Sequence, residues 1–118
     1  QEVIKKRINQ YKTLRDLIVK KLNEIPGVSC DAPDGACYVF PNIKQTGMSS
    51  AQFADFVLKE AGVALLPGTC FGELGEGYVR LCFTHRPEII EEGLERMKEA
   101  LAQKIDKQLF ALDGYRGR

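Results

Sequence analysis

The chain has 118 residues, the usual size of one domain, and its 44% hydrophobic and 28% charged residues exclude a disordered chain. A net charge of +1 gives no overall field to attract nucleic acid or an anionic membrane, and no apolar run approaches the ~18 residues of a transmembrane helix. Because the chain starts without Met or the apolar core of a signal peptide, we expect residues 1–118 to be a single domain of a larger protein.

The first predicted element is an amphipathic helix over residues 2–25, ended by Pro26-Gly27. Its apolar stripe consists of Ile4, Ile8, Tyr11, Leu14, Ile18, Leu22 and Ile25. The other face carries seven basic against three acidic residues, a local charge of +4. This charge permits nucleic-acid binding, but a solvated face is favoured because no aromatic residues are interleaved with the bases.

A pair of short strands is predicted next. Residues 28–30 are a candidate strand, and the turn sequence DAPDG at 31–35 separates them from an aromatic and β-branched strand at 36–40. Pro41-Asn42 ends the second strand, and a polar loop follows to Gly47. The short turn predicts that these strands are neighbours.

A second helix begins at Ser49, which with Gln52 forms the pattern of a capping box. Gly62 stands where a helix C-terminal glycine is expected. A short apolar strand is predicted at 63–66, followed by the loop PGTCFGELGEG at 67–77. This loop lacks the phosphate-binding pattern G-x-x-x-x-G-K-[ST], so we interpret its glycines as a flexible connection that needs positive φ.

The last strand, residues 78–83, is the clearest one. Alternation along it predicts that Val79, Leu81 and Phe83 face the core and that Tyr78, Arg80 and Cys82 face the other way. Pro87 then opens the last helix as its first residue. The buried stripe of this helix is predicted to consist of Ile90, Leu94, Met97, Leu101 and Ile105. Residues 113–118 are predicted to be a frayed tail.

The order of elements is helix, strand, strand, helix, strand, strand, helix. Short turns between strands favour antiparallel pairing. We therefore predict an α+β fold, in which a small, mostly antiparallel sheet of three to four strands is flanked by three helices.

Arg80 is the main candidate for chemistry. An Arg held on a strand face presents a planar fork that suits a carboxylate. On the residues alone, a solvent-facing Arg or a structural ion pair is favoured over this binding role. His85 is the only histidine, and a lone His before a helix is typical of a surface or capping residue.

The four cysteines, at 30, 37, 70 and 82, form no C-x-x-C pair, whereas a zinc site needs paired ligands at short spacing, and His85 is the only histidine. We expect reduced, partly buried thiols of a cytoplasmic protein rather than disulfides or metal ligands. Cys37 or Cys70 could act as a nucleophile only with a base beside it in space, which the sequence does not show.

Four motifs together carry a family resemblance: Arg15-Asp16 in the first helix, then PDGACYVFPN, AGVALLPGTCFG and GYVRL. In this order, between Tyr11 and Ile105, they resemble the C-terminal small domain of class I/II aminotransferases. These are pyridoxal-phosphate enzymes of fold type I. Each motif is weak alone, but four in order are specific.

The resemblance implies a role for several residues. Arg80 matches the Arg that binds the α-carboxylate of the amino acid or 2-oxo acid. Cys37 matches a wall residue of the substrate pocket that is usually aromatic, and residues 67–72 match a loop near the mouth of the active site that moves on closure.

The resemblance also implies which functional residues lie outside this chain. In the family, the lysine and the phosphate ligands of pyridoxal phosphate lie in the large domain, and no Ser-x-x-Lys segment occurs here. The expected parent is a cytoplasmic homodimer whose partner for this chain is the missing large domain, with no catalytic, cofactor-binding or metal-binding residue in this chain. We expect the chain alone to be inactive.

Two other functions are weighed against this one. The first is a free-standing α+β module that binds an amino acid or a similar small ligand without catalysis. The second is a nucleic-acid-binding module that uses the basic first helix, whose binding would depend strongly on salt. The family resemblance favours the aminotransferase over both.

Overall fold

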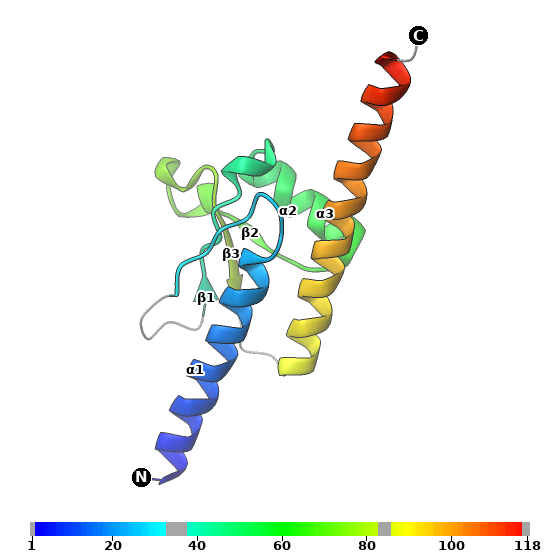
Figure 1. The fold of residues 1–118 in the computed structure, drawn as a ribbon. Coiled ribbons are helices and arrows are strands. Elements are labelled where there is room, and N and C mark those ends of the chain that lie inside the picture. The colour runs from blue at the N-terminus through cyan, green and yellow to red at the C-terminus, as the bar shows by residue number, and fades with distance from the viewer. Residues whose placement is uncertain (1, 33–37, 83–85, 117–118) are drawn as a thin grey trace.

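Figure 1 shows a computed structural model of the chain, which describes residues 2–32, 38–82 and 86–116. Its α-helices and strands are, in chain order, α1 (Glu2–Asn23), β1 (Tyr38–Val39), α2 (Ser50–Ala61), β2 (Leu66–Pro67), β3 (Val79–Cys82) and α3 (Pro87–Arg116). Short 3-10 helices, η1 (Lys44–Thr46), η2 (Gly68–Phe71) and η3 (Glu73–Gly75), complete the fold. The predicted α+β class is confirmed.

The sheet has the strand order β1-β3-β2, and both pairings are antiparallel. Val39 lies opposite Leu81 on one side of β3, and Leu66 lies opposite Arg80 on the other side. The central position of β3 means that hydrogen bonds hold its backbone from both sides. This sheet is the small antiparallel sheet that the sequence predicts.

The strands are shorter than predicted. Residues 28–30 form a single bridge, between Ser29 and Asn42, instead of a strand. The side chain of Asn23 explains this, because it accepts from the Cys30 amide at 2.9 Å and donates to the Cys30 carbonyl at 2.8 Å. The Cys30 backbone groups are thereby occupied by a side chain and not by a sheet partner.

The first helix ends at Asn23, two residues before the predicted end. Ile18 and Leu22 are fully buried, as its periodicity predicts, but Ile4 is 61% exposed. Ile4 belongs to the predicted apolar stripe and is exposed because α1 extends past the rest of the molecule at its N-terminal end, as Figure 1 shows.

The capping signals of the second helix are confirmed. The Ser49 side chain accepts from the Gln52 amide, and the Gln52 side chain accepts from the Ser49 amide. Gly62 ends the helix with φ of +71°. These local bonds hold both ends of α2 and need no tertiary contact.

The last helix begins at Pro87, as predicted, and buries Ile90, Leu94, Met97 and Leu101. Ile105 is 38% exposed, because the helix there extends past the sheet (Figure 1). The helix also continues to Arg116, so residues 113–116 of the predicted frayed tail form the end of α3. Each residue added to an existing helix gains a hydrogen bond, which allows α3 to continue through Gly114.

The core lies where the three helices meet the sheet. Its fully buried members include Ile18, Phe53, Val57 and Val79. Lys21 and Glu95 join α1 to α3 through an ion pair of 2.9 Å, which raises the pKa of Lys21 and lowers that of Glu95.

The molecule measures 68 × 31 × 21 Å. In the part of the chain that the structure describes, no helix is long and apolar enough to span a membrane.

Candidate functional site

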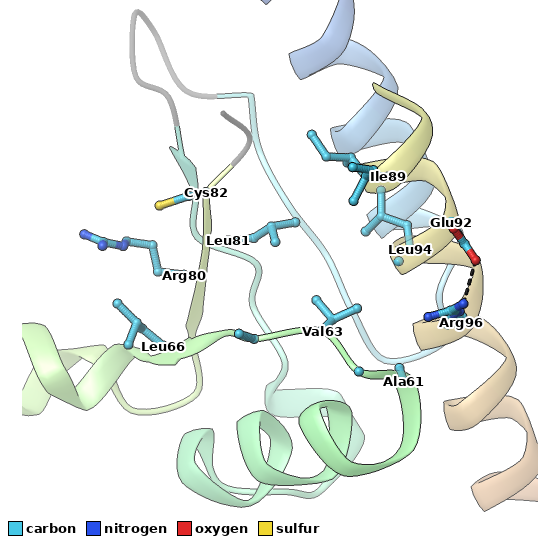
Figure 2. Close-up of a pocket in the computed structure, with 14 residues that line it drawn as sticks. Ala61, Val63, Leu66, Arg80, Leu81, Cys82, Ile89, Glu92, Leu94 and Arg96 are labelled. Atoms are coloured by element: carbon cyan, nitrogen blue, oxygen red, sulfur yellow. Dashed lines mark hydrogen bonds and ion pairs between the residues drawn. The ribbon is translucent and has the colours of Figure 1, made fainter. Parts of the chain in front are cut away.

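The side chains of β3 alternate as predicted. Val79 and Leu81 are buried, whereas Arg80 is half-buried and Cys82 is exposed. Figure 2 shows Leu81 directed towards α3 and Arg80 extending away from it. Phe83, the third predicted core residue, lies outside the described residues. The alternation therefore places Arg80 on the face of the sheet that the core does not use.

Three aromatic rings gather around Arg80. The guanidinium carbon of Arg80 lies 4.6 Å from the centre of the Phe71 ring and 5.2 Å from that of Tyr38. Phe40 meets both rings edge-on, with centroids 5.3 Å from Tyr38 and 5.7 Å from Phe71. These four residues are called the Arg80 cluster below. No pattern in the sequence predicts that these rings contact Arg80.

No described residue is a polar partner of the Arg80 guanidinium. Its Nε is buried without a hydrogen bond, the one such side-chain nitrogen or oxygen atom among the described residues. Neither terminal nitrogen donates a hydrogen bond there, and neither is buried. An unsatisfied buried donor costs about 1–3 kcal/mol. A structural ion pair of Arg80 is therefore absent from the described part of the chain, and the fork is available to an outside acceptor.

Ser50 holds the start of β3, and sequence reasoning missed it. Its fully buried hydroxyl accepts from the amides of Gly77 at 2.8 Å and Tyr78 at 3.2 Å. Ser50 is the first residue of α2, so these bonds tie the N-terminal end of that helix to the backbone two residues before Arg80. The only signal in the sequence was a second serine directly after the capping Ser49.

The glycine loop between β2 and β3 is folded rather than a plain connection. It contains η2 and η3, and Gly68 and Gly75 pack backbone to backbone, so a Cβ on either would collide with the other. Gly72 and Gly77 have the expected positive φ, of +125° and +90°. The prediction of positive φ thus holds for two of the four glycines, while close approach explains the other two. This packing carries Phe71 to Arg80.

A pocket of about 440 Å³ lies on the α3 side of β3. Segment 61–66, β3 and the first turns of α3 line it, with apolar side chains that include Val63, Leu81 and Ile89 (Figure 2). An ion pair of 2.6 Å between Glu92 and Arg96 lies among the lining residues. Arg80 contributes to the wall, but its side chain extends away from α3.

The described cysteines, Cys30, Cys70 and Cys82, are free thiols. Burial raises the pKa of Cys30 to about 11, with a smaller contribution from the neighbouring Asp31, so this thiol is a poor nucleophile. Cys37 and His85 lie outside the described residues. Among those described, no three His, Cys, Asp or Glu side chains are placed to hold a metal ion.

The described residues do not fit pyridoxal phosphate, which needs a lysine for its aldehyde and donors for its phosphate. Four lysines have partners: Lys21 with Glu95, Lys59 with Asp55, Lys44 over the Tyr78 ring and Lys104 over the Phe56 ring. None of the ten lysines of the chain lines the described pocket. The cofactor would therefore be held by residues other than those described.

Two curated aminotransferases are similar to this chain in sequence. The aspartate aminotransferase of Pyrococcus horikoshii is 45% identical over 92 residues, which are 78% of this chain and 24% of that protein. Aromatic-amino-acid aminotransferase 2 of Thermococcus litoralis is 41% identical over 103 residues, which are 87% of this chain and 26% of that protein. The chain thus spans about a quarter of the length of these curated relatives.

A solved aminotransferase structure is similar to this chain as well. The crystal structure of an aromatic aminotransferase from Pyrococcus horikoshii OT3 matches with a TM-score of 0.83 and 41% identity, over 87% of this chain and 27% of that one. The family described as aminotransferase class I and II matches residues 1–97. Because the family model covers most of the chain and the fold matches as well, the chain belongs to the class I and II aminotransferase family.

Proposed function

We propose that the chain is the C-terminal small domain of a pyridoxal-phosphate-dependent aminotransferase and that Arg80 binds the α-carboxylate of the substrate. The parent transfers an amino group between an amino acid and a 2-oxo acid. The observation that carries this proposal is the unpartnered guanidinium of Arg80 in its aromatic surroundings. When bound, pyridoxal phosphate supplies an electron sink, and the contribution of this chain is to bind and orient the substrate.

The physical basis is the match between a guanidinium and a carboxylate. Both groups are planar, and two parallel N–H···O bonds fix both the position and the orientation of the acid. Strand pairing on both sides of β3 holds the Arg80 backbone in place. A substrate held there would present its amino or oxo carbon in a defined direction.

Further features of the parent follow from the family and remain predictions. Cys37 forms part of the substrate pocket wall, and residues 67–72 lie near the mouth of the active site. The cofactor lysine and the phosphate ligands lie in the large domain, which is the main partner of this chain. The parent is expected to be a cytoplasmic homodimer.

A free-standing amino-acid-binding module is the alternative, since Arg80 would bind a carboxylate there as well. Two observations favour the aminotransferase: the chain belongs to an aminotransferase family, and it spans only about a quarter of the length of its relatives. A reading frame that continues upstream of Gln1 into a lysine-bearing large domain would support it. Nucleic-acid binding is less favoured because Arg15 and Lys21 on α1 pair with Asp16 and Glu95.

The test is a kinetic comparison of Arg80 variants of the parent enzyme. Arg80→Ala should lower kcat/KM by roughly 30- to 5,000-fold, because removing one partner of such a charge pair costs ~2–5 kcal/mol. Arg80→Lys should also be impaired, since it keeps the charge but loses the planar fork. Cofactor absorbance should be unchanged in both variants.

Arg96→Ala is a matched control. Arg96 pairs with Glu92 on the exposed surface of α3, away from the Arg80 side chain (Figure 2). Its loss should leave kcat/KM as it is. If Arg80→Ala lowers the Tm but retains kcat/KM and affinity for carboxylates, Arg80 is structural and the proposal is wrong.

A further inference from the structure

We propose that Phe71 and Tyr38 are positioning residues for Arg80, which hold its guanidinium ready before the carboxylate arrives. This inference rests on the proposed function of Arg80. The two rings come from different parts of the chain, Tyr38 from β1 and Phe71 from η2. Both lie within the ~6 Å over which a ring face attracts a cation.

The rings form one assembly because Phe40 contacts both of them edge-on, at interplanar angles of 89° and 90°. Edge-to-face geometry is the favoured arrangement for aromatic pairs. Phe40 and Arg80 also occupy the same face of the sheet, since β1 and β3 pair in the register of Val39 with Leu81. Phe40 therefore spaces the two rings that contact Arg80.

Holding the guanidinium in advance affects binding through entropy. A free Arg side chain has many rotamers, and part of this conformational freedom is lost when the guanidinium binds a carboxylate. In the cluster the Nε end is already covered, and the terminal nitrogens stay accessible. The rings thus reduce the conformational entropy that the Arg80 side chain loses when the carboxylate binds.

Phe71 contributes little to the core. It is 50% exposed, and Phe40 is 40% exposed, whereas core residues such as Val39 and Val79 are fully buried. A large apolar side chain this exposed gains little from burial, and its described contacts are with Arg80 and Phe40. Replacement of Phe71 should consequently affect binding more than folding.

The test measures variants of the parent enzyme with three 2-oxo acids, pyruvate, 2-oxoglutarate and phenylpyruvate, each compared with its methyl ester. Phe71→Leu should weaken the binding of all three acids by a similar factor of about 5- to 30-fold, the range expected for a cation–π contact of about 1–2 kcal/mol. Tyr38→Leu should act in the same direction. The esters formed at the α-carboxyl group, which lack the charge of the α-carboxylate, should bind as before.

Two further variants separate positioning from a structural role. Phe71→Trp keeps a ring face and should restore most of the lost affinity. Leu74→Ala removes a side chain that is 98% exposed in the neighbouring η3, and it should change neither affinity nor Tm. Rescue by Trp with an unchanged Tm would support the proposal.

Several results would overturn it: unchanged acid binding in Phe71→Leu, an equal loss for the esters, or a loss confined to phenylpyruvate. The last result would mean that the rings contact the substrate side chain. If Arg80→Ala itself leaves acid binding intact, the proposed function fails. If Arg80→Ala abolishes binding and Phe71→Leu does not weaken it, only the present inference fails.

Discussion

Ser50 is a single residue that holds the backbone just before β3. Its hydroxyl accepts from two backbone amides, and replacing Ser50 with Ala would leave both without that partner. We expect Ser50→Ala in the parent to lower the free energy of unfolding by about 1–3 kcal/mol and to lower kcat/KM, because the start of β3 is released. Urea unfolding and steady-state kinetics measure the two effects.

Ser29→Ala is the control for this prediction, since Ser29 is exposed and contributes to the fold through its backbone bridge. It should change stability by less than about 0.5 kcal/mol. Equal stability of the two variants would show that water or a neighbouring group replaces the Ser50 hydroxyl.

Sequence reasoning reached some residues of the site and not others. Alternation along residues 78–83 predicts the face of Arg80, and the family resemblance supplies a role for it. Ser50 was missed because its partners lie far along the chain, 27 residues away for the bond from Gly77. The resemblance places the loop of Phe71 near the active site, but the contact of its ring with Arg80 depends on how that loop folds. No local pattern records such contacts.

At the scale of elements, the folded loop of η2 and η3 is the feature that brings Phe71 to Arg80. A Cβ at Gly68 would meet the carbonyl groups of Gly75 and Tyr78, which are backbone atoms and cannot move aside alone. We expect Gly68→Ala to cost about 1–3 kcal/mol of stability, as overpacking does, and to weaken carboxylate binding in the parent.

Thermal unfolding and inhibition by a 2-oxo acid measure these changes. Thr69→Ala, an exposed substitution in the same η2, should be neutral in both. If Gly68→Ala binds carboxylates normally, the backbone packing of the loop is not what positions Phe71.

The elements themselves were predictable to different degrees. The ends of α2 followed from the capping box of Ser49 and Gln52, because capping is local. The strands came out too long, since pairing depends on which backbone groups remain free, and Asn23 takes those of Cys30. The end of α3 at Arg116 did not follow from the sequence, because Gly114 lies inside the helix and gives no stop signal there.

For the whole molecule, the positions of the lysines lead to a prediction about how the chain reacts with the cofactor. Most lie on exposed helix faces or already have a partner, and none lines the described pocket. After incubation of the 118-residue chain with pyridoxal phosphate and reduction by borohydride, mass spectrometry should find only sparse labelling spread over several lysines. Complete labelling of a single lysine would contradict this reading of the chain.

The order of the strands has a consequence for how the chain is made. Of the three described strands, β3 is the last in sequence and the one to which both others bind. About 40 residues lie between β1 and β3, which a ribosome needs on the order of 2–8 s to synthesise at about 5–20 residues per second. During that interval β1 has no strand to pair with, and the rings of Tyr38 and Phe40 have no Arg80 beside them. β2 and Phe71 are synthesised only near its end. A translational pause shortly before Val79 would therefore prolong the stage at which the nascent chain is most exposed to aggregation and to chaperones.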